Sequence, residues 1–249
     1  MKKTNLLFLA GFLCLVTVLL SFKKESHSKE DTNLATAVNG AWKLQGSQDD
    51  EVAIFTDGYF VRTTYNKANK KLHYTYGGPY ELDNSNTLSF TFEFNTANKE
   101  AVGETVSVPL RIDANTITLD NNGTTETWKR VDDGKGALAG VWRSGGRLQD
   151  GKVTYAPLAA RKTFKVFSGT RFQWTAMNTQ TKEMLGTGGG TYTFVNGKYT
   201  ENLEYFSRDS SRVGMSLSFE SKVDSDNLYQ TGPNSRGEQM SEIWGKVKL

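Results

Sequence analysis

The sequence predicts an all-β protein in which two tandem antiparallel β-barrels follow an N-terminal export segment. Three observations lead to this fold class. An apolar run opens the chain, an internal repeat recurs at an offset of about 112 residues, and strand-type alternation between turn signals runs through both copies. With 249 residues and 12% aromatics the chain can bury a substantial core, and its composition is not that of a disordered protein.

Residues 1–22 form the first element, which we interpret as a signal peptide or a signal anchor. Lys2 and Lys3 precede an apolar run over residues 6–22, an arrangement typical of export segments. The run has no A-x-A cleavage triplet and is short for a bilayer span, so cleavage and retention both stay open. We expect an exported protein in the periplasm, in the cell envelope or secreted, with attachment to the membrane through residues 6–22 as the alternative to release.

Charge and cysteine content exclude several classes of function. Cys14 is the only cysteine and lies inside the apolar run, where apolar residues on both sides make it a poor match to a lipidation site. Removal of residues 1–22 leaves the chain close to neutral, so nucleic acid is not an expected partner. The mature chain would also have no thiol chemistry. Residues 23–37 are polar and aperiodic, and we predict that they form a tether.

The rest of the chain contains two copies of one pattern. Gly-x-Trp opens the first copy at Trp42 and the second at Trp142. "FTDGYFVRTTYN" (residues 55–66) aligns without gaps on "FSGTRFQWTAMN" (residues 167–178), and "TWKRV" late in the first copy matches "IWGKV" late in the second. The alignment predicts a first barrel, a linker and a second barrel over residues 38–131, 132–139 and 140–249.

Each copy reads as about eight strands. In "TLSFTFEFN" (residues 87–95) apolar and polar residues alternate with period 2, and Asp-Gly and Asn-Gly pairs mark turns between the runs. Eight antiparallel strands in about 100 residues predict an up-and-down barrel. In the second copy the predicted strands centre on Trp142, Phe164, Phe172, Tyr192, Leu203, Leu217, Leu228 and Trp244.

The glycine-rich stretch "GTGGG" (residues 186–190) invites comparison with a phosphate-binding loop. Such a loop needs a following helix whose free N–H groups hold the anion. Here the residues that follow predict a strand, an Asn-Gly hairpin and a second strand. We therefore expect the glycines to relieve a bulge or a tight bend in a curved sheet.

The opening Gly-x-Trp and a basic residue near the end of the last strand resemble the lipocalin signature. In lipocalins the tryptophan lies across the barrel floor beneath a stacked basic side chain. The resemblance implies that Trp42 pairs with Lys129 or Arg130, and that Trp142 pairs with Lys246.

The second copy carries a further resemblance over most of residues 137–249. Its stretches "SGTRFQW", "GTGGGTYT", "NGKYTENLEYFSRDSSRVGMSLSFE" and "EIWGKV" resemble a lipocalin-like, calycin-type family of exported bacterial proteins called "membrane or secreted protein", whose function is unknown. The resemblance implies a fold and a compartment, and no reaction. The first copy lacks the "TEN…SRD" stretch, so the resemblance says less about what the first barrel does.

Few residues suit catalysis. The histidines are His27 in the tether and His73 in the first copy, and no nucleophile triad or metal-spaced cluster can be assembled. We predict no catalytic residue, no metal ligand and no cofactor. A carboxylate-dependent hydrolase stays as an alternative, and it would pair Glu201 with a second carboxylate such as Glu220 or Asp209.

Glu201 is the first candidate ligand-binding residue. The alignment places it where the first copy has Phe90, on a face that is otherwise aromatic and aliphatic. If that face lines the barrel, the carboxylate needs a partner, which Arg171, Arg208, Arg212 or a ligand would supply. A register slip near Asn202 would instead place Glu201 outside.

Trp174 and Tyr192 are the candidate aromatic wall of the same site. Trp174 stands where the first copy has Arg62, and Tyr192 matches Tyr80. An inward Trp174 would be a stacking platform, and an outward one would cover the barrel or form an interface. Arg171 is a further candidate, but strict alternation puts it on the face opposite to Trp174 unless a bulge intervenes.

Arg208 is the last candidate, in the loop that follows the Glu201 strand. It would rim the barrel mouth and contact a polar ligand, or else belong to a solvated loop with Asp209 and Arg212. Glu204 is expected to face solvent. Together these residues predict a binding protein whose second barrel takes a small polar or amphipathic molecule or a glycan fragment. The alternatives are a structural or partner-binding envelope protein with filled barrels, and the hydrolase.

Overall fold

The computed structural model describes residues 34–121, 123–157, 159–234 and 236–248. The predictions for the export segment, for most of the tether, for Cys14 and for His27 lie outside these residues. None of the helices in the described ranges is long and apolar enough to span a bilayer.

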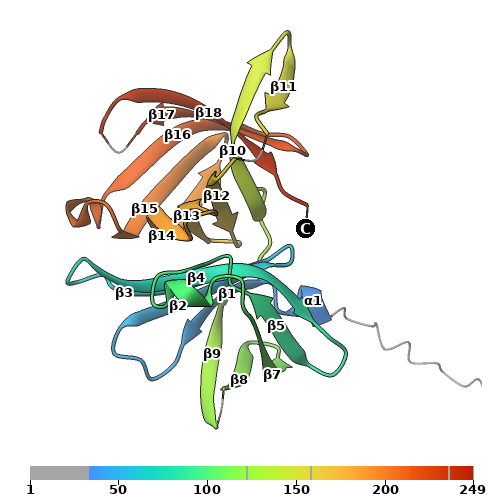
Figure 1. Ribbon diagram of the computed structural model, residues 1–249. Coiled ribbons are helices and arrows are strands. Elements are labelled where there is room, and N and C mark those ends of the chain that lie inside the picture. The colour runs from blue at the N-terminus through green and yellow to red at the C-terminus, as the bar shows by residue number, and fades with distance from the viewer. Residues whose placement is uncertain (1–33, 122, 158, 235, 249) are drawn as a thin grey trace, which may run out of the picture. The chain divides into compact units, whose positions relative to one another are not determined.

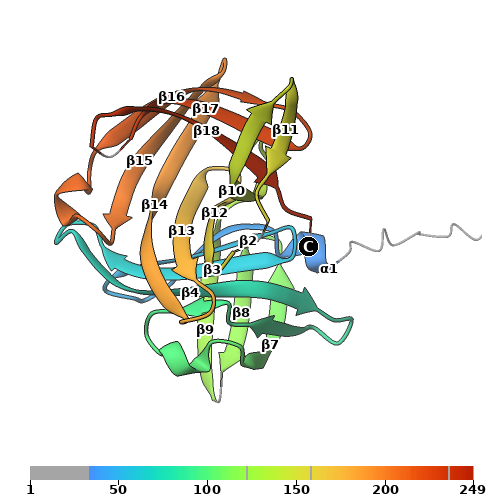
Figure 2. The same ribbon diagram turned by 45° about the horizontal axis from the view of Figure 1, so that its top comes forward.

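Two closed antiparallel barrels follow one another along the chain, and eight strands close each of them in the described residues (Figures 1 and 2). The predicted fold class is therefore confirmed. In the first barrel the eight strands pair in chain order and β9 returns to β1, while the short β6 pairs with β4, so that β5 is followed in the barrel by β7. Its elements are α1 (Leu34–Ala37), β1 (Gly40–Leu44), β2 (Asp50–Thr56), β3 (Tyr59–Asn66), β4 (Lys71–Leu82), β5 (Thr87–Thr91), β6 (Phe94–Asn95), the 3₁₀ turn η1 (Lys99–Ala101), β7 (Thr105–Asp113), β8 (Thr116–Asn121) and β9 (Thr124–Asp132). The last residues of the predicted tether thus form α1.

The second barrel closes through pairing of β10 with β18. Its eight barrel strands contain the eight predicted centres, and β11 adds a hairpin arm on the distal part of β10 (Figure 1). The elements are β10 (Gly140–Gln149), β11 (Lys152–Tyr155), β12 (Arg161–Phe167), β13 (Arg171–Asn178), β14 (Glu183–Val195), β15 (Lys198–Phe206), the 3₁₀ turn η2 (Ser210–Arg212), β16 (Ser216–Val223), β17 (Asn227–Pro233) and β18 (Gln239–Lys246).

The strand registers bear out the repeat residue by residue. Arg62 lies opposite Ala53 in the first barrel, and its counterpart Trp174 lies opposite Lys165 in the second. The tryptophans of the last strands, Trp128 and Trp244, also occupy equivalent positions. Each of these closing tryptophans pairs with an aliphatic residue of the preceding strand. Equivalent positions of the two barrels can therefore be compared directly.

Both barrel floors carry the expected tryptophan and basic side chain. The Arg130 guanidinium lies 4.0 Å from the Trp42 ring centre, and the Lys246 ammonium lies 5.6 Å from that of Trp142. Each indole N–H donates to the carbonyl of the residue four positions earlier, at 2.8 Å in both barrels. Of the two basic residues considered for Trp42, the structure selects Arg130.

The glycines of β14 lie at bulges, as predicted. The register shifts where β14 meets β13 beyond Gly186, and again between Gly189 and Gly190 where it meets β15. A Cβ at Gly189 would collide with the Tyr205 side chain, and one at Gly190 would collide with the Asn202 carbonyl oxygen. The second bulge puts an extra residue into β15, which changes the face on which later side chains lie.

The outer faces of the two barrels share an apolar cluster. Tyr59 and Phe164 meet edge to face there, with ring centres 5.3 Å apart. The buried members are Ala41, Ile54, Tyr59, Val61 and Phe94 from the first barrel and Val141, Phe164, Val166 and Met177 from the second. Burial of these nine side chains stabilises the two barrels as one unit.

Asp132, at the end of β9, joins the same unit through hydrogen bonds. Its carboxylate accepts from the backbone N–H of Ala41 and of Gly134. It also accepts from Ser168 Oγ at 2.8 Å, from the Gly169 N–H and from both the N–H and the hydroxyl of Thr170. Burial raises the pKa of this carboxyl, but the hydrogen bonds outweigh burial and the net shift is downward.

Candidate ligand-binding cavities

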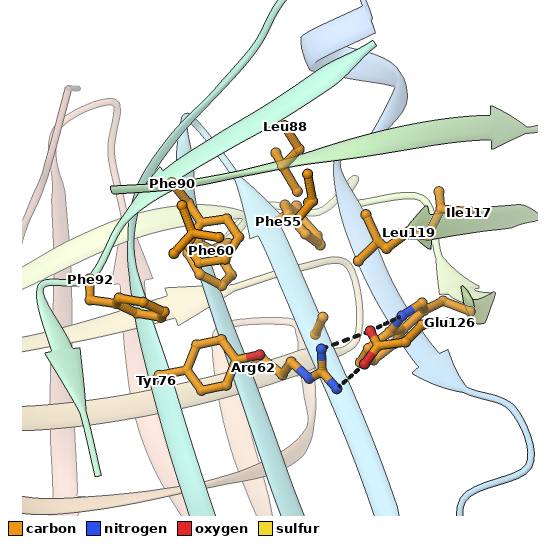
Figure 3. Close-up of a pocket in the computed structure, with 14 residues that line it drawn as sticks. Phe55, Phe60, Arg62, Tyr76, Leu88, Phe90, Phe92, Ile117, Leu119 and Glu126 are labelled. Carbon is orange, nitrogen blue, oxygen red and sulfur yellow. Dashed lines mark hydrogen bonds and ion pairs between the residues drawn. The ribbon is translucent and has the colours of Figure 1, made fainter. Parts of the chain in front are cut away.

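The first barrel encloses a cavity of about 320 Å³ with mainly apolar walls (Figure 3). Aromatic rings gather on one side, where Phe90 lies 4.6 Å from Phe60 and 5.3 Å from Phe92 between ring centres. The lining residues are Ala53, Phe55, Phe60, Arg62, Tyr76, Leu88, Phe90, Phe92, Val106, Val108, Ile117, Leu119, Glu126 and Trp128.

The charged groups of this first cavity are paired with each other. Arg62 donates to both carboxylate oxygens of Glu126 at 2.8 Å each, the bidentate pair drawn in Figure 3. It also binds Glu51 on β2, and its guanidinium lies 4.7 Å from the Trp128 ring centre. A bidentate guanidinium–carboxylate pair is among the strongest neutralising contacts in proteins.

The second barrel encloses a cavity of about 390 Å³ with more polar walls. Its lining combines aromatic and aliphatic side chains with five charged ones. The lining residues are Ser144, Arg161, Thr163, Lys165, Trp174, Ala176, Glu201, Phe206, Arg208, Leu217, Phe219, Asn234, Met240, Glu242 and Trp244.

Glu201 points into this second cavity, as the alignment with Phe90 predicted, and only 5% of it is exposed. Its partner is Lys165, whose ammonium donates to Glu201 Oε1 at 2.8 Å and to Gln230 Oε1 at 3.1 Å. The Tyr199 hydroxyl donates to the same carboxylate oxygen at 2.8 Å. The three arginines considered as partners form no ion pair with Glu201 in the described residues.

Glu242 is a second carboxyl group on the same cavity. The Trp244 indole N–H donates to its Oε2 at 3.1 Å. Burial raises the pKa of Glu242, the positive charge of Lys165 lowers it, and the negative charge of Glu201 raises it again, with a net upward shift. In the part of the chain that the structure describes, Glu242 forms no ion pair.

Trp174 and Arg208 line the second cavity, as the inward alternatives for both residues required. The Trp174 ring meets Phe206 at a steep angle, with 5.6 Å between ring centres. The Arg208 guanidinium lies 5.4 Å from the Trp174 ring centre and donates to the Leu185 carbonyl at 3.2 Å. Arg208 itself is exposed, so it lies at the rim.

Arg171 does not line this cavity, and the proposal of one pocket containing it is wrong. Its guanidinium donates to Glu204 at 2.7 Å and to the Tyr65 hydroxyl of the first barrel at 3.3 Å. Glu204 lies on the outer face of β15, as alternation from Leu203 requires, but the first barrel covers that face, so the expectation that Glu204 faces solvent is wrong. Burial raises the pKa of Glu204, but the charge of Arg171 and the hydrogen bonds from Tyr65 and Arg171 together outweigh burial and lower the pKa overall.

Tyr192 is likewise not among the lining residues. It is 6% exposed, and its hydroxyl donates to the Ser168 carbonyl at 2.8 Å. Its ring packs against Phe167 and Tyr199. Its counterpart Tyr80 packs in the first barrel in the same way, so the shared tyrosine belongs to the barrel core.

Sequence reasoning missed Lys165 and Glu242, which line the second cavity, and Gln230, which accepts a hydrogen bond from Lys165. The signal for Lys165 lies in the alignment itself, where it replaces Ala53. Glu242 precedes Trp244 by two residues, as Glu126 precedes Trp128. A comparison of inward positions around both closing tryptophans would have found it.

No model of a known protein family matches the chain, and no curated protein matches it significantly in sequence. Within the described ranges no group of three or more histidine, cysteine or acidic side chains is placed to hold a metal ion. The case for function therefore depends on the two cavities.

Proposed function

We propose that the chain is an exported binding protein whose second barrel takes a small polar or amphipathic molecule, such as a glycan fragment. The observation that carries this proposal is the mixed lining of the 390 Å³ cavity. An aromatic wall with a few buried hydrogen-bonding groups is typical of small-molecule sites. Trp174 and Phe206 supply the wall, and Lys165 and Glu201 supply part of the polar base.

A structural role with filled barrels has less support. Barrels of eight strands can be filled completely by their own side chains. Here both cavities reach the lower range of volumes typical of ligand sites, about 300 Å³ and above. Empty volume of this size costs stability, so its presence in both copies favours a binding role.

The hydrolase has less support as well. Asp209 and Glu220 are exposed, and neither lines the second cavity. A hydrolase would therefore have to use Glu201 with Glu242. We expect no release of nitrophenol from nitrophenyl glycosides by the full-length chain, and release that Glu242→Gln abolishes would replace the binding proposal with the hydrolase.

The test of the binding role is native mass spectrometry of the full-length chain purified from its own host. We expect a retained mass of one small molecule, which Trp174→Ala loses because the stacking wall is gone. Phe92→Ala is the matched control, since it removes an aromatic side chain from the other cavity. Retention by Trp174→Ala together with loss in Phe92→Ala would move the site to the first barrel, and absence of any retained mass would favour the structural role.

A further inference from the structure

Glu126 and Glu242 occupy the same position in the two barrels. Each lies two residues before the closing tryptophan and accepts a hydrogen bond from that indole, at 3.2 Å in the first barrel and 3.1 Å in the second. Each also lines the cavity of its own barrel. The two barrels therefore present the same carboxyl group to two different cavities.

The surroundings of the two carboxyl groups differ at one residue in particular. Arg62 fills the first cavity beside Glu126 with a guanidinium that binds both carboxylate oxygens. Its counterpart in the second barrel is Trp174, which has no charge to offer. Glu242 therefore keeps the tryptophan hydrogen bond and lacks the cation.

The other cations of the second cavity do not replace Arg62. Lys165 is committed to Glu201 and Gln230, at 2.8 and 3.1 Å, and lies 4.8 Å from the Trp244 ring centre without pairing with Glu242. Arg161 and Arg208 line the cavity but are exposed, and no ion pair connects either to Glu242 within the described residues.

The residue opposite Glu242 differs between the barrels as well. Gln230 on the neighbouring strand is 2% exposed, and its Nε2 has no hydrogen-bond partner in the described part of the chain. In the first barrel the equivalent position is Leu119. The Nε2 group is a donor and calls for an acceptor, so the case for a cation rests on Glu242 and on the exchange of Arg62 for Trp174.

We propose that the second cavity binds a ligand with an ammonium or guanidinium group, which pairs with Glu242 in the place that Arg62 takes in the first barrel. The apolar part of the ligand packs on Trp174, Phe206 and Met240 along the cavity wall. This inference rests on the proposed function and narrows it to organic cations with an apolar body. The first barrel shows in the same chain how such a pair is arranged, with the cation beside both the carboxylate and the indole.

The test compares three probes that share one alkyl chain and differ in the head group: octylammonium, octanol and octanoate. Isothermal titration calorimetry with the full-length chain at neutral pH should show octylammonium as the tightest of the three. Glu242→Gln should weaken octylammonium by about tenfold or more and leave octanol nearly unchanged, because only the cation loses a charged partner. Glu126→Gln, the same substitution in the other barrel, should leave octylammonium affinity at the wild-type value.

Trp174→Arg gives a second readout that does not depend on removing Glu242. It supplies the guanidinium from the chain, as Arg62 does in the first barrel, and should abolish octylammonium binding while circular dichroism stays unchanged. If octylammonium and octanol bind with equal affinity and Glu242→Gln has no effect, the proposal of a cationic ligand is overturned. The proposed binding function would still stand. If none of the three probes binds, both the cation proposal and the proposed binding function are rejected for ligands of this kind.

Discussion

Three inward positions that are apolar in the first barrel are polar in the second, and the new side chains bind one another. Lys165 replaces Ala53, Glu201 replaces Phe90, and Gln230 replaces Leu119. Two charged residues of the first barrel are in turn uncharged in the second. Thr163 stands in place of Glu51, and Trp174 stands in place of Arg62.

A closed barrel of this kind can therefore hold its buried charge cluster at either of two places. The cluster of the first barrel consists of Glu51, Arg62 and Glu126, and it leaves the rest of the cavity apolar. In the second barrel the buried pair is Lys165 with Glu201, and Lys165 lies directly opposite Trp174, which stands in place of Arg62. In this arrangement Glu242 has no cation partner among the described residues, and this unpaired carboxyl group makes the second cavity the better candidate site.

The largest expected effect comes from breaking the relocated pair. Lys165→Ala leaves the Glu201 carboxylate buried without its cation, which should lower the free energy of unfolding by about 3–5 kcal/mol. Adding Glu201→Phe, which restores the first barrel's residues at both positions, should recover most of that loss. Urea unfolding followed by tryptophan fluorescence measures both. A loss below about 1 kcal/mol for Lys165→Ala would mean that the pair behaves like an exposed ion pair. The different charge clusters of the two barrels would then contribute little to stability.

The two equivalent glutamates should respond in opposite directions to the same substitution. Glu126→Gln breaks a bidentate pair and should cost about 1–3 kcal/mol. Glu242→Gln removes a carboxyl group whose pKa is raised by burial, so it should stabilise the protein slightly at neutral pH. Because a raised pKa favours the protonated folded state, the gain should grow as pH rises through the pKa of Glu242 and vanish at acidic pH. The melting temperature of each variant, measured between pH 4 and 8 relative to wild type, tests this. A shift in the same direction for both variants would contradict the comparison.

The barrel floors offer the smallest contrast. Arg130 stacks at 4.0 Å over its tryptophan and donates to three carbonyl oxygens, whereas Lys246 stacks at 5.6 Å and donates to one. Arg130→Met should therefore cost about 1–2 kcal/mol, and Lys246→Met about 0.5 kcal/mol. Differential scanning calorimetry of the two variants tests the order. Equal shifts would show that the floors are energetically equivalent despite their geometry.

Much of the architecture could be predicted because each strand signal is local. Period-2 alternation and turn pairs placed all eight strand centres of the second barrel, and the repeat placed Glu201 inward through its match to Phe90. The partner of Glu201 could not be found in this way. Lys165 lies on β12, which is separated from β15 by two strands, so the pair forms across the lumen and not along a strand register.

Arg171 and Glu204 could not be placed from sequence for a different reason. Both side chains lie on the outer face, where the first barrel covers them and Tyr65 contacts both. Alternation within one strand shows which residues share a face. It does not show that a second domain covers the outer face.

Asp132 shows that the repeat boundary in the sequence is not a boundary of self-sufficient parts. A segment that begins at the second Gly-x-Trp would leave the turn at residues 168–170 without the carboxylate that accepts four of its hydrogen bonds. Excision, permutation or transplantation of the second barrel therefore has to carry the end of β9 with it. The smallest transferable module of the second repeat includes Asp132, which the sequence assigns to the linker and the structure assigns to the last strand of the first barrel.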